Sequence, residues 1–188
     1  MYYRIILYPL FATTLFATFL YMNKTAITKT LFTIWPSLDD YETMLAERVH
    51  NHALCSCNTP LLTNRIIDKI IELNVKQQTI HNLALRLNRV IEKLPADTQA
   101  ILRSYYRSYG IATNIPVQAK QLGIAERTFY RHLDRANEYL ARHLTNIGIN
   151  FFTWQDLLHE HQWIKATFMR QCPPSPQRKT VRQKELNH

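Results

Sequence analysis

The sequence predicts an all-α protein in which a helical hairpin or bundle is followed by a helix-turn-helix unit. From Ser37 onward, apolar residues recur at helical intervals. No run alternates between apolar and polar residues over a strand's length, so we expect no sheet. The 188 residues are 46% hydrophobic and 20% charged, which is enough apolar material for a core and favours one ordinary or two small domains.

Residues 1–35 form an apolar N-terminal segment that is a candidate membrane anchor. Its run Ile5–Tyr21 holds 17 residues without a charge. As a helix this run would span roughly 25 Å, slightly less than a hydrocarbon core of about 30 Å. The two lysines that follow would favour keeping the rest of the chain inside the cell. Two other interpretations stay open: an apolar helix that packs on protein, or a true translation start further downstream, at Met22 or Met44.

Charge and cysteine content indicate the compartment and the kind of partner. The formal net charge of +9 favours a polyanionic partner or an anionic membrane surface. Cys55, Cys57 and Cys172 form an odd set without the spacing of a disulfide framework, which suits a reducing compartment. We therefore expect a cytoplasmic protein, tethered to the inner face of the cell membrane if the N-terminal segment is an anchor.

Residues 37–94 are predicted to form the helical hairpin or bundle. A first helix starts after Pro36 and Ser37, and the Cys55–Pro60 stretch breaks the pattern. A second pattern begins at Leu61, falters over residues 74–78 and resumes as far as Leu94. These long apolar faces need partners, so the hairpin is expected to pack on itself, on the downstream domain or on a second copy in a homodimer.

Residues 95–150 are predicted to form the helix-turn-helix domain, with a C-terminal packing helix and a basic tail after it. The pattern gives the following helices: Asp97–Tyr109, Pro116–Leu122, Glu126–His143 and, as the packing helix within residues 151–172, Thr153–Arg170. Residues 173–188 have no apolar period and are expected to be a disordered, solvated basic tail.

The turn between the second and third of these helices carries the local signal. In a helix-turn-helix, a small residue of the first helix faces the second, and an apolar residue just before the turn is buried; these are Ala119 and Leu122. Gly123 is expected to take the left-handed conformation and Ile124 to fill the angle between the helices. On the third helix, the residues predicted to be buried are Phe129, Leu133, Ala136 and Leu140.

The opposite face of the third helix is rich in arginine. Arg127 and Arg131 are four residues apart, where two like charges slightly destabilise an isolated helix, so stability alone would not select them. Guanidinium groups near the start of a helix can bond guanine edges or clamp phosphates in a DNA major groove. Asp134 and Glu138 would be repelled by phosphate, so contact is expected within the first two turns.

Residues from about Leu87 to Leu144 resemble region 4 of bacterial sigma factors and phage late-gene regulators of the ArpU and RinA type. The shared pattern includes Leu94-Pro95, then Ala119-x-x-Leu122-Gly123-Ile124-Ala125-x-x-Thr128-Phe129-Tyr130-Arg131, and the tail Ala136-x-x-x-Leu140. The resemblance implies a domain that recognises double-stranded promoter DNA, with RNA polymerase as a candidate partner of the upstream helices. The predicted DNA-contacting residues are Glu126, Arg127, Thr128, Tyr130, Arg131 and, further along, Arg135.

Three positions depart from this family pattern. Ala125 stands where Ser or Thr usually caps the recognition helix, a loss that typically costs about 1 kcal/mol. The connection over residues 111–115 is longer than usual by about two residues and ends in Pro116. Gln118 replaces an aliphatic residue. A regulator or a divergent sigma-like factor therefore fits better than a primary sigma factor.

Other kinds of function have weaker support. With only 3 glycines, the chain has neither a dinucleotide fingerprint nor a glycine-rich phosphate loop, and no organised acid, base or nucleophile indicates an enzyme. The residues His50, His52, Cys55 and Cys57 could supply zinc ligands, but their spacing matches no known finger, so neither a metal nor another cofactor is expected. The alternative hypothesis is a membrane-anchored helical interaction module, with contact through residues 5–21 and no DNA binding.

Overall fold

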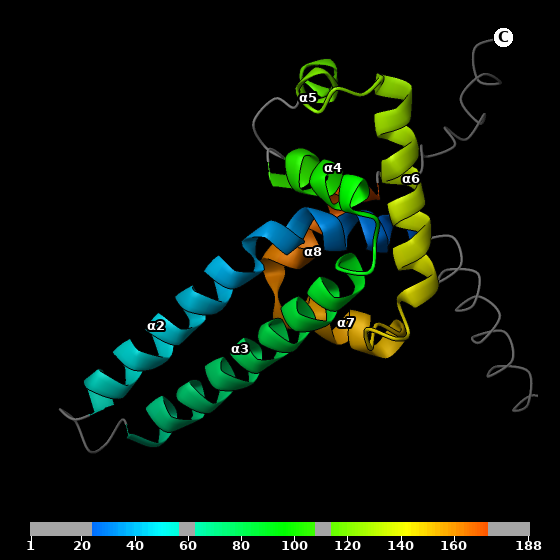
Figure 1. The fold of residues 1–188 in the computed structure, drawn as a ribbon. Helices are drawn as coiled ribbons and strands as arrows, with labels where there is room; N and C mark the ends of the chain where they lie inside the picture. Colours follow the sequence, from blue (N-terminus) through cyan, green and yellow to red (C-terminus); the bar gives the residue numbers. More distant parts are fainter. Residues whose placement is uncertain (1–23, 57–62, 108–113, 173–188) are drawn as a thin grey trace, which may run out of the picture.

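The computed structural model describes residues 24–56, 63–107 and 114–172, and within these ranges the chain is helical apart from short connections, with no strand (Figure 1). The predicted all-α fold class is therefore confirmed. A two-helix hairpin projects from the body, in which the remaining helices surround a short helix near the N-terminus (Figure 1).

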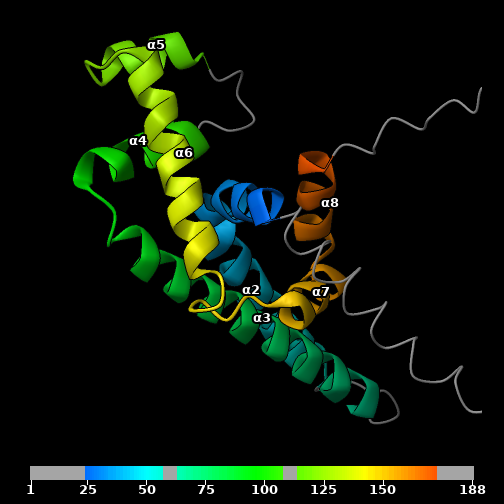
Figure 2. The ribbon, with the colours of Figure 1, turned by 90° about the vertical axis from the view of Figure 1, so that its right-hand side faces the viewer.

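A first helix runs through residues 24–34 and is followed by these elements: η1 Trp35–Ser37, α2 Leu38–Ser56, α3 Thr63–Ile91, α4 Ala96–Arg107, α5 Ile115–Gln121, α6 Glu126–His143, α7 Phe151–Glu160 and α8 Gln162–Gln171. Figure 2 shows α6 crossing the body in front of the hairpin, with α7 and α8 to one side.

The helix through residues 24–34 lies at the centre of the core. Ile27, Leu31, Phe32 and Ile34 are at most 3% exposed. Phe32 stacks on Tyr106 of α4 with ring centroids 5.5 Å apart. The last part of the predicted N-terminal segment is thus a packed element of the body. The run Ile5–Tyr21, on which the anchor and start-site interpretations depend, lies outside the described residues.

Helices α2 and α3 pack against each other as the predicted hairpin. α3 is continuous from Thr63 to Ile91, so the helix runs through residues 74–78, where the apolar pattern falters. Leu73 and Ile80 are both buried and lie two turns apart, so the buried face passes through this stretch. Ion pairs from Lys69 and Lys76 to Glu72 add i,i+3 and i,i+4 support on the exposed side.

The predicted single C-terminal helix is two helices, because the chain is extended at His161. This residue, with φ −121° and ψ 91°, ends α7 and precedes α8. Its ring is fully buried, and its Nδ1 lies 3.4 Å from the hydroxyl oxygen of Tyr41. Trp163 packs on the same Tyr41 ring, with centroids 4.8 Å apart. Tertiary packing on α2 therefore stabilises a bend that the helical periodicity does not indicate.

The burial predicted for this C-terminal region is confirmed. The predicted packing helix does bury apolar residues: Trp154, Leu157, Leu158, Ile164 and Phe168. The rings of the first and last of them meet edge to face, with centroids 5.3 Å apart, and so hold α7 against α8. The basic tail, residues 173–188, lies outside the described residues.

Candidate nucleic-acid interface

The region expected to contact DNA consists of α4, α5 and α6, which pack on one another (Figure 1). The start of α5 is fixed by Asn114, whose Oδ1 accepts a hydrogen bond from the Val117 N–H at 3.4 Å, and by Pro116 in its first turn. Both residues suit a helix start, since Asn is a favoured cap and Pro needs no hydrogen-bond acceptor there.

A tight turn centred on Gly123 joins α5 to α6. Gly123 has φ +67°, which confirms the predicted left-handed conformation. Its N–H donates a hydrogen bond to the Lys120 carbonyl at 3.1 Å, and the Ile124 N–H donates one to the Ala119 carbonyl at 3.0 Å. These two bonds form a Schellman motif, which ends a helix and redirects the chain. The chain is therefore bent at this point and does not continue as one long helix.

The side chains around this turn follow the prediction except at Leu122. Ala119 is 1% exposed, and Ile124 is partly buried and packs on the core, as expected. Leu122 is 37% exposed, so its predicted burial is wrong. Because α5 has seven residues and lies at the edge of the body, its buried side holds only Gln118 and Ala119.

The inner face of α6 is anchored in the core. All four residues predicted to be buried there are confirmed: Phe129, Leu133, Ala136 and Leu140 are at most 7% exposed. Phe129 meets Tyr105 of α4 edge to face, with ring centroids 6.1 Å apart. These contacts fix the rotation of α6 about its own axis, and so determine which residues point outward.

Two polar contacts that the sequence did not indicate also join these helices. The buried hydroxyl of Thr98 on α4 lies 2.8 Å from His132 Nδ1 on α6. Gln118, the polar replacement on α5, donates from Nε2 to the Ser104 carbonyl of α4 at 3.3 Å. Its Oε1 is buried and has no hydrogen-bond partner in the described part of the chain. The unexpected glutamine therefore acts as a tether between α5 and α4.

The tyrosines of α4 are core and rim residues, as the helical spacing indicates. Tyr106 is 5% exposed, and Tyr105 is partly buried beside it with ring centroids 4.8 Å apart. Tyr109, the predicted end of this helix, lies outside the described residues.

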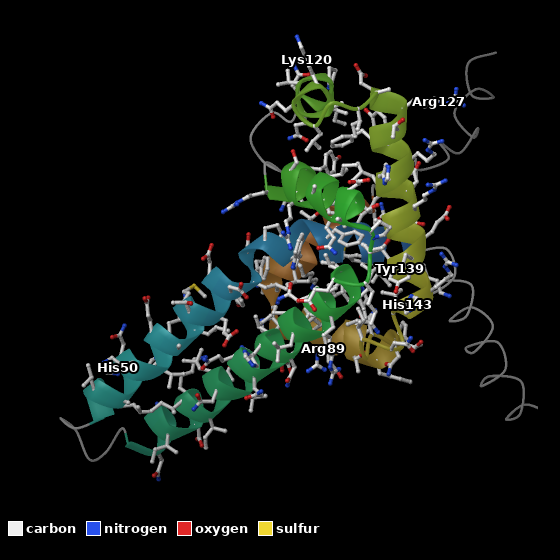
Figure 3. The ribbon with its side chains drawn as sticks, viewed as in Figure 1. His50, Arg89, Lys120, Arg127, Tyr139 and His143 are labelled. Carbon is white, nitrogen blue, oxygen red and sulfur yellow. The ribbon has the colours of Figure 1, made fainter. Side chains whose placement is uncertain are left out.

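The predicted DNA-contacting residues share the outer surface of α6, where Glu126, Arg127, Tyr130, Arg131 and Arg135 are exposed and Thr128 is partly buried. Figure 3 shows Arg127 at the free upper end of α6, away from the body. A shallow hollow on this helix is lined by three of the arginines, Tyr130, Asp134 and Glu138. The acidic residues occupy the later turns, so the cationic part is the start of the helix.

The arginine side chains of this surface are not neutralised by nearby acids. Among residues 24–56, 63–107 and 114–172, neither Arg127, Arg131 nor Arg135 forms an ion pair. Two positive charges one turn apart, neither held in an ion pair, raise the local potential and attract an anion.

The start of α6 also presents uncapped backbone amides. Ala125 is the N-cap residue and makes no side-chain hydrogen bond. Its carbonyl accepts the N–H groups of Thr128 and Phe129 at 2.9 and 3.0 Å. The N–H groups of Glu126 and Arg127 precede these and lack the usual side-chain acceptor. An uncapped helix start of this kind can bind phosphate through its amides and its dipole.

The alternative sites considered in the sequence lie partly or wholly outside the described residues. Where the chain is described, no three His, Cys, Asp or Glu side chains come together as a metal site. The side chain of Cys55 and all of Cys57 lie outside that description. None of the described helices combines the length and the apolar character needed to cross a bilayer.

No family model matches the sequence, and no curated protein or solved structure matches the chain.

Proposed function

We propose that the chain is a sequence-specific DNA-binding transcription regulator, similar to sigma region 4, and that α6 enters the major groove. The observation that supports this most directly is the division of α6 into two faces. One face is locked into the core through Phe129 and Leu140, and the other presents Arg127 and Arg131 to solvent without ion pairs among the described residues.

In this proposal, the first two turns of α6 make the contacts. Arg127 and Arg131 supply planar forks of donors that can bond guanine edges or phosphate oxygens. The uncapped amides at Glu126 and Arg127 bind a backbone phosphate at the helix start. Asp134 and Glu138 keep the later turns away from the phosphates, so the helix enters the groove N-terminus first.

The experiment is a selection of bound fragments from random duplex DNA, followed by anisotropy titrations of the selected site at several salt concentrations. The double substitution Arg127→Ala and Arg131→Ala is expected to lower affinity by about tenfold or more. If both arginines contact phosphate, the slope of log K against log salt should become shallower by about 1.8. Unfolding by urea should be unchanged, because both side chains are exposed.

A matched control removes the same charge elsewhere. Arg48 of α2 and Arg65 of α3 are exposed on the projecting hairpin, and changing both to alanine should leave specific affinity within about twofold. An equal loss in both double variants would mean that the net charge, and not α6, governs binding. An unchanged affinity in the α6 variant would overturn the groove assignment.

The other partners expected from the sequence belong to the same proposal. The hairpin α2–α3 is the candidate surface for RNA polymerase or a second copy, because it projects from the body (Figure 1). A cytoplasmic location suits a protein that acts on DNA. No catalytic step, cofactor or metal enters this function.

A further inference from the structure

One side of α3 carries large aliphatic side chains that the described helices leave exposed. Ile67, Ile71 and Val75 are 46%, 55% and 54% exposed. They lie on the side of the helix opposite Leu73 and Ile80, which are buried where α3 packs on α2. Figure 1 shows α2 along one side of the outer half of α3 and no described helix along the other. The helix is therefore apolar on two opposite sides, and the described fold covers one of them.

This outer stripe of α3 contains no charged residue. Asn64 and Gln78 extend it by one step at each end, and both are exposed. The charged residues of the same stretch lie beside the stripe: Arg65, Asp68, Lys69, Glu72 and Lys76. Val75 also lines a hollow of about 330 Å³ between α3 and the end of α7, so α7 leaves that part of the stripe open. Exposed aliphatic groups without charges are typical of the centre of a protein interface.

The order of residues along the outer stripe is the same in both directions. Ile71 is at its centre, and Ile67 and Val75 lie four residues to either side. Asn64 and Gln78 lie seven residues to either side. In an antiparallel pair of copies, a two-fold axis between the two Ile71 side chains therefore brings Ile67 against Val75. The same axis brings Asn64 against Gln78, so aliphatic groups meet aliphatic groups and amides meet amides. A symmetric interface between identical copies requires a self-complementary pattern of this kind.

We propose that the hairpin binds a second copy of this chain through an antiparallel contact between the two α3 helices, centred on Ile71. A partner of another kind would have to supply a matching neutral face, whereas a second copy provides it through the mirrored order of the stripe. The two hairpins then point in opposite directions, with the two bodies at opposite ends of the dimer. The inference rests on the proposed function only in using the hairpin as a partner surface, and the association itself needs no DNA.

The size of the contact sets the expected affinity. From Asn64 to Gln78 the outer stripe covers about four turns of helix. One helix face of this length buries less than about 1,200 Å² in a dimer, which is the range of weak and transient interfaces. We therefore expect a monomer–dimer equilibrium with a Kd in the micromolar range.

The test is analytical ultracentrifugation of the full chain from about 1 to 200 µM, a range chosen around that Kd. The mass should rise with concentration toward twice the 22.3 kDa of one chain. Ile71→Lys places two ammonium groups together at the two-fold axis and should raise the Kd by about 100-fold or more. Met169→Lys, at a side chain of α8 that is also 55% exposed, should change the Kd by about twofold at most. Circular dichroism of both variants should match that of the parent chain, because both side chains are exposed.

A second pair of variants tests the antiparallel register. Asn64→Lys combined with Gln78→Glu creates two opposite-charge contacts, and this variant should dimerise at least as tightly as the parent chain. Asn64→Lys combined with Gln78→Lys places like charges in the same contacts and should raise the Kd by about tenfold. Equal Kd values for these two variants, or the reverse order, would overturn the antiparallel contact.

Two other outcomes would overturn the whole inference. A parent chain that stays monomeric up to about 200 µM would leave the outer stripe to another protein, such as RNA polymerase. Equal weakening by Ile71→Lys and Met169→Lys would show that added charge, and not the stripe, controls association. The Arg127→Ala, Arg131→Ala variant should dimerise as the parent chain does, so the loss of DNA binding and the loss of dimerisation are separate results.

Discussion

Protonation of His161 is expected to destabilise the fold as the solution becomes acidic. The imidazole is fully buried between α2 and the junction of α7 with α8. Burial lowers its pKa from 6.5 to about 4, and the nearby Lys76 ammonium acts in the same direction. Nε2 has no hydrogen-bond partner in the described part of the chain, and the nearest carboxylate, that of Glu160, lies 3.8 Å away. The folded protein therefore holds this ring neutral.

The sign and size of the effect follow from the two pKa values. Between pH 6.5 and pH 4 the unfolded chain binds the proton and the folded chain does not. The free energy of unfolding therefore decreases as the pH is lowered from 6.5 to 4. Above pH 6.5 this contribution to stability is complete. The difference in pKa corresponds to about 3 kcal/mol in total, of which about 2 kcal/mol is lost by pH 5.

The assay is urea unfolding at pH 7.5, 6 and 5 in moderate salt, comparing the parent chain with His161→Gln. The variant should be less stable at pH 7.5 but should lose about 2 kcal/mol less on acidification to pH 5. The other histidines are present in both chains, so their titration cancels in the comparison. Glu72, whose pKa Lys69 and Lys76 lower to about 2, titrates below this window. Identical pH dependence in the two chains would refute the reasoning.

Two further predictions concern the fold. Gly148→Ala should destabilise by about 2 kcal/mol in urea unfolding, because φ is +76° and a Cβ would come 2.2 Å from Arg86 Nη1, which would have to give up its hydrogen bond to the Ile147 carbonyl at 3.2 Å. Gly123→Ala, at φ +67° with open space around it, should cost about 1 kcal/mol; equal losses would mean that displacing the Arg86 side chain costs nothing. Phe129→Ala should cost about 3–5 kcal/mol, because the side chain is fully buried, while Phe152→Ala should change stability by about 0.5 kcal/mol or less; similar effects would show that α6 is not anchored through Phe129.

The amphipathic pattern of α6 was sufficient to predict both its bounds and its buried face. Its four buried residues recur at steps of 4, 3 and 4, and both neighbouring helices pack on that face. The turn at Gly123 was predictable because few residues other than glycine take a left-handed conformation. The exposure of Arg127 and Arg131 then follows from geometry, since they lie opposite the buried residues.

Other features depend on tertiary contacts that leave no periodic signal. The bend at His161 involves neither proline nor glycine, and its buried ring packs on Tyr41, 120 residues away. The Thr98 contact with His132 joins two residues that look like ordinary surface positions in the sequence. The exposure of Leu122 reflects how little of the body reaches the end of α5.

The central position of the helix through residues 24–34 has a consequence for synthesis. This helix leaves the ribosome before its partners, because Phe32 stacks on Tyr106, and Trp35, directly after the helix, donates from its indole to Asn88 Oδ1 at 2.7 Å. Ile27 of this helix lines a groove together with Ile149 and Phe151, which are made later still. During translation an apolar helix must therefore wait for the last of its partners while more than a hundred further residues are made. We expect nascent chains to engage a chaperone through this helix until α7 has been released.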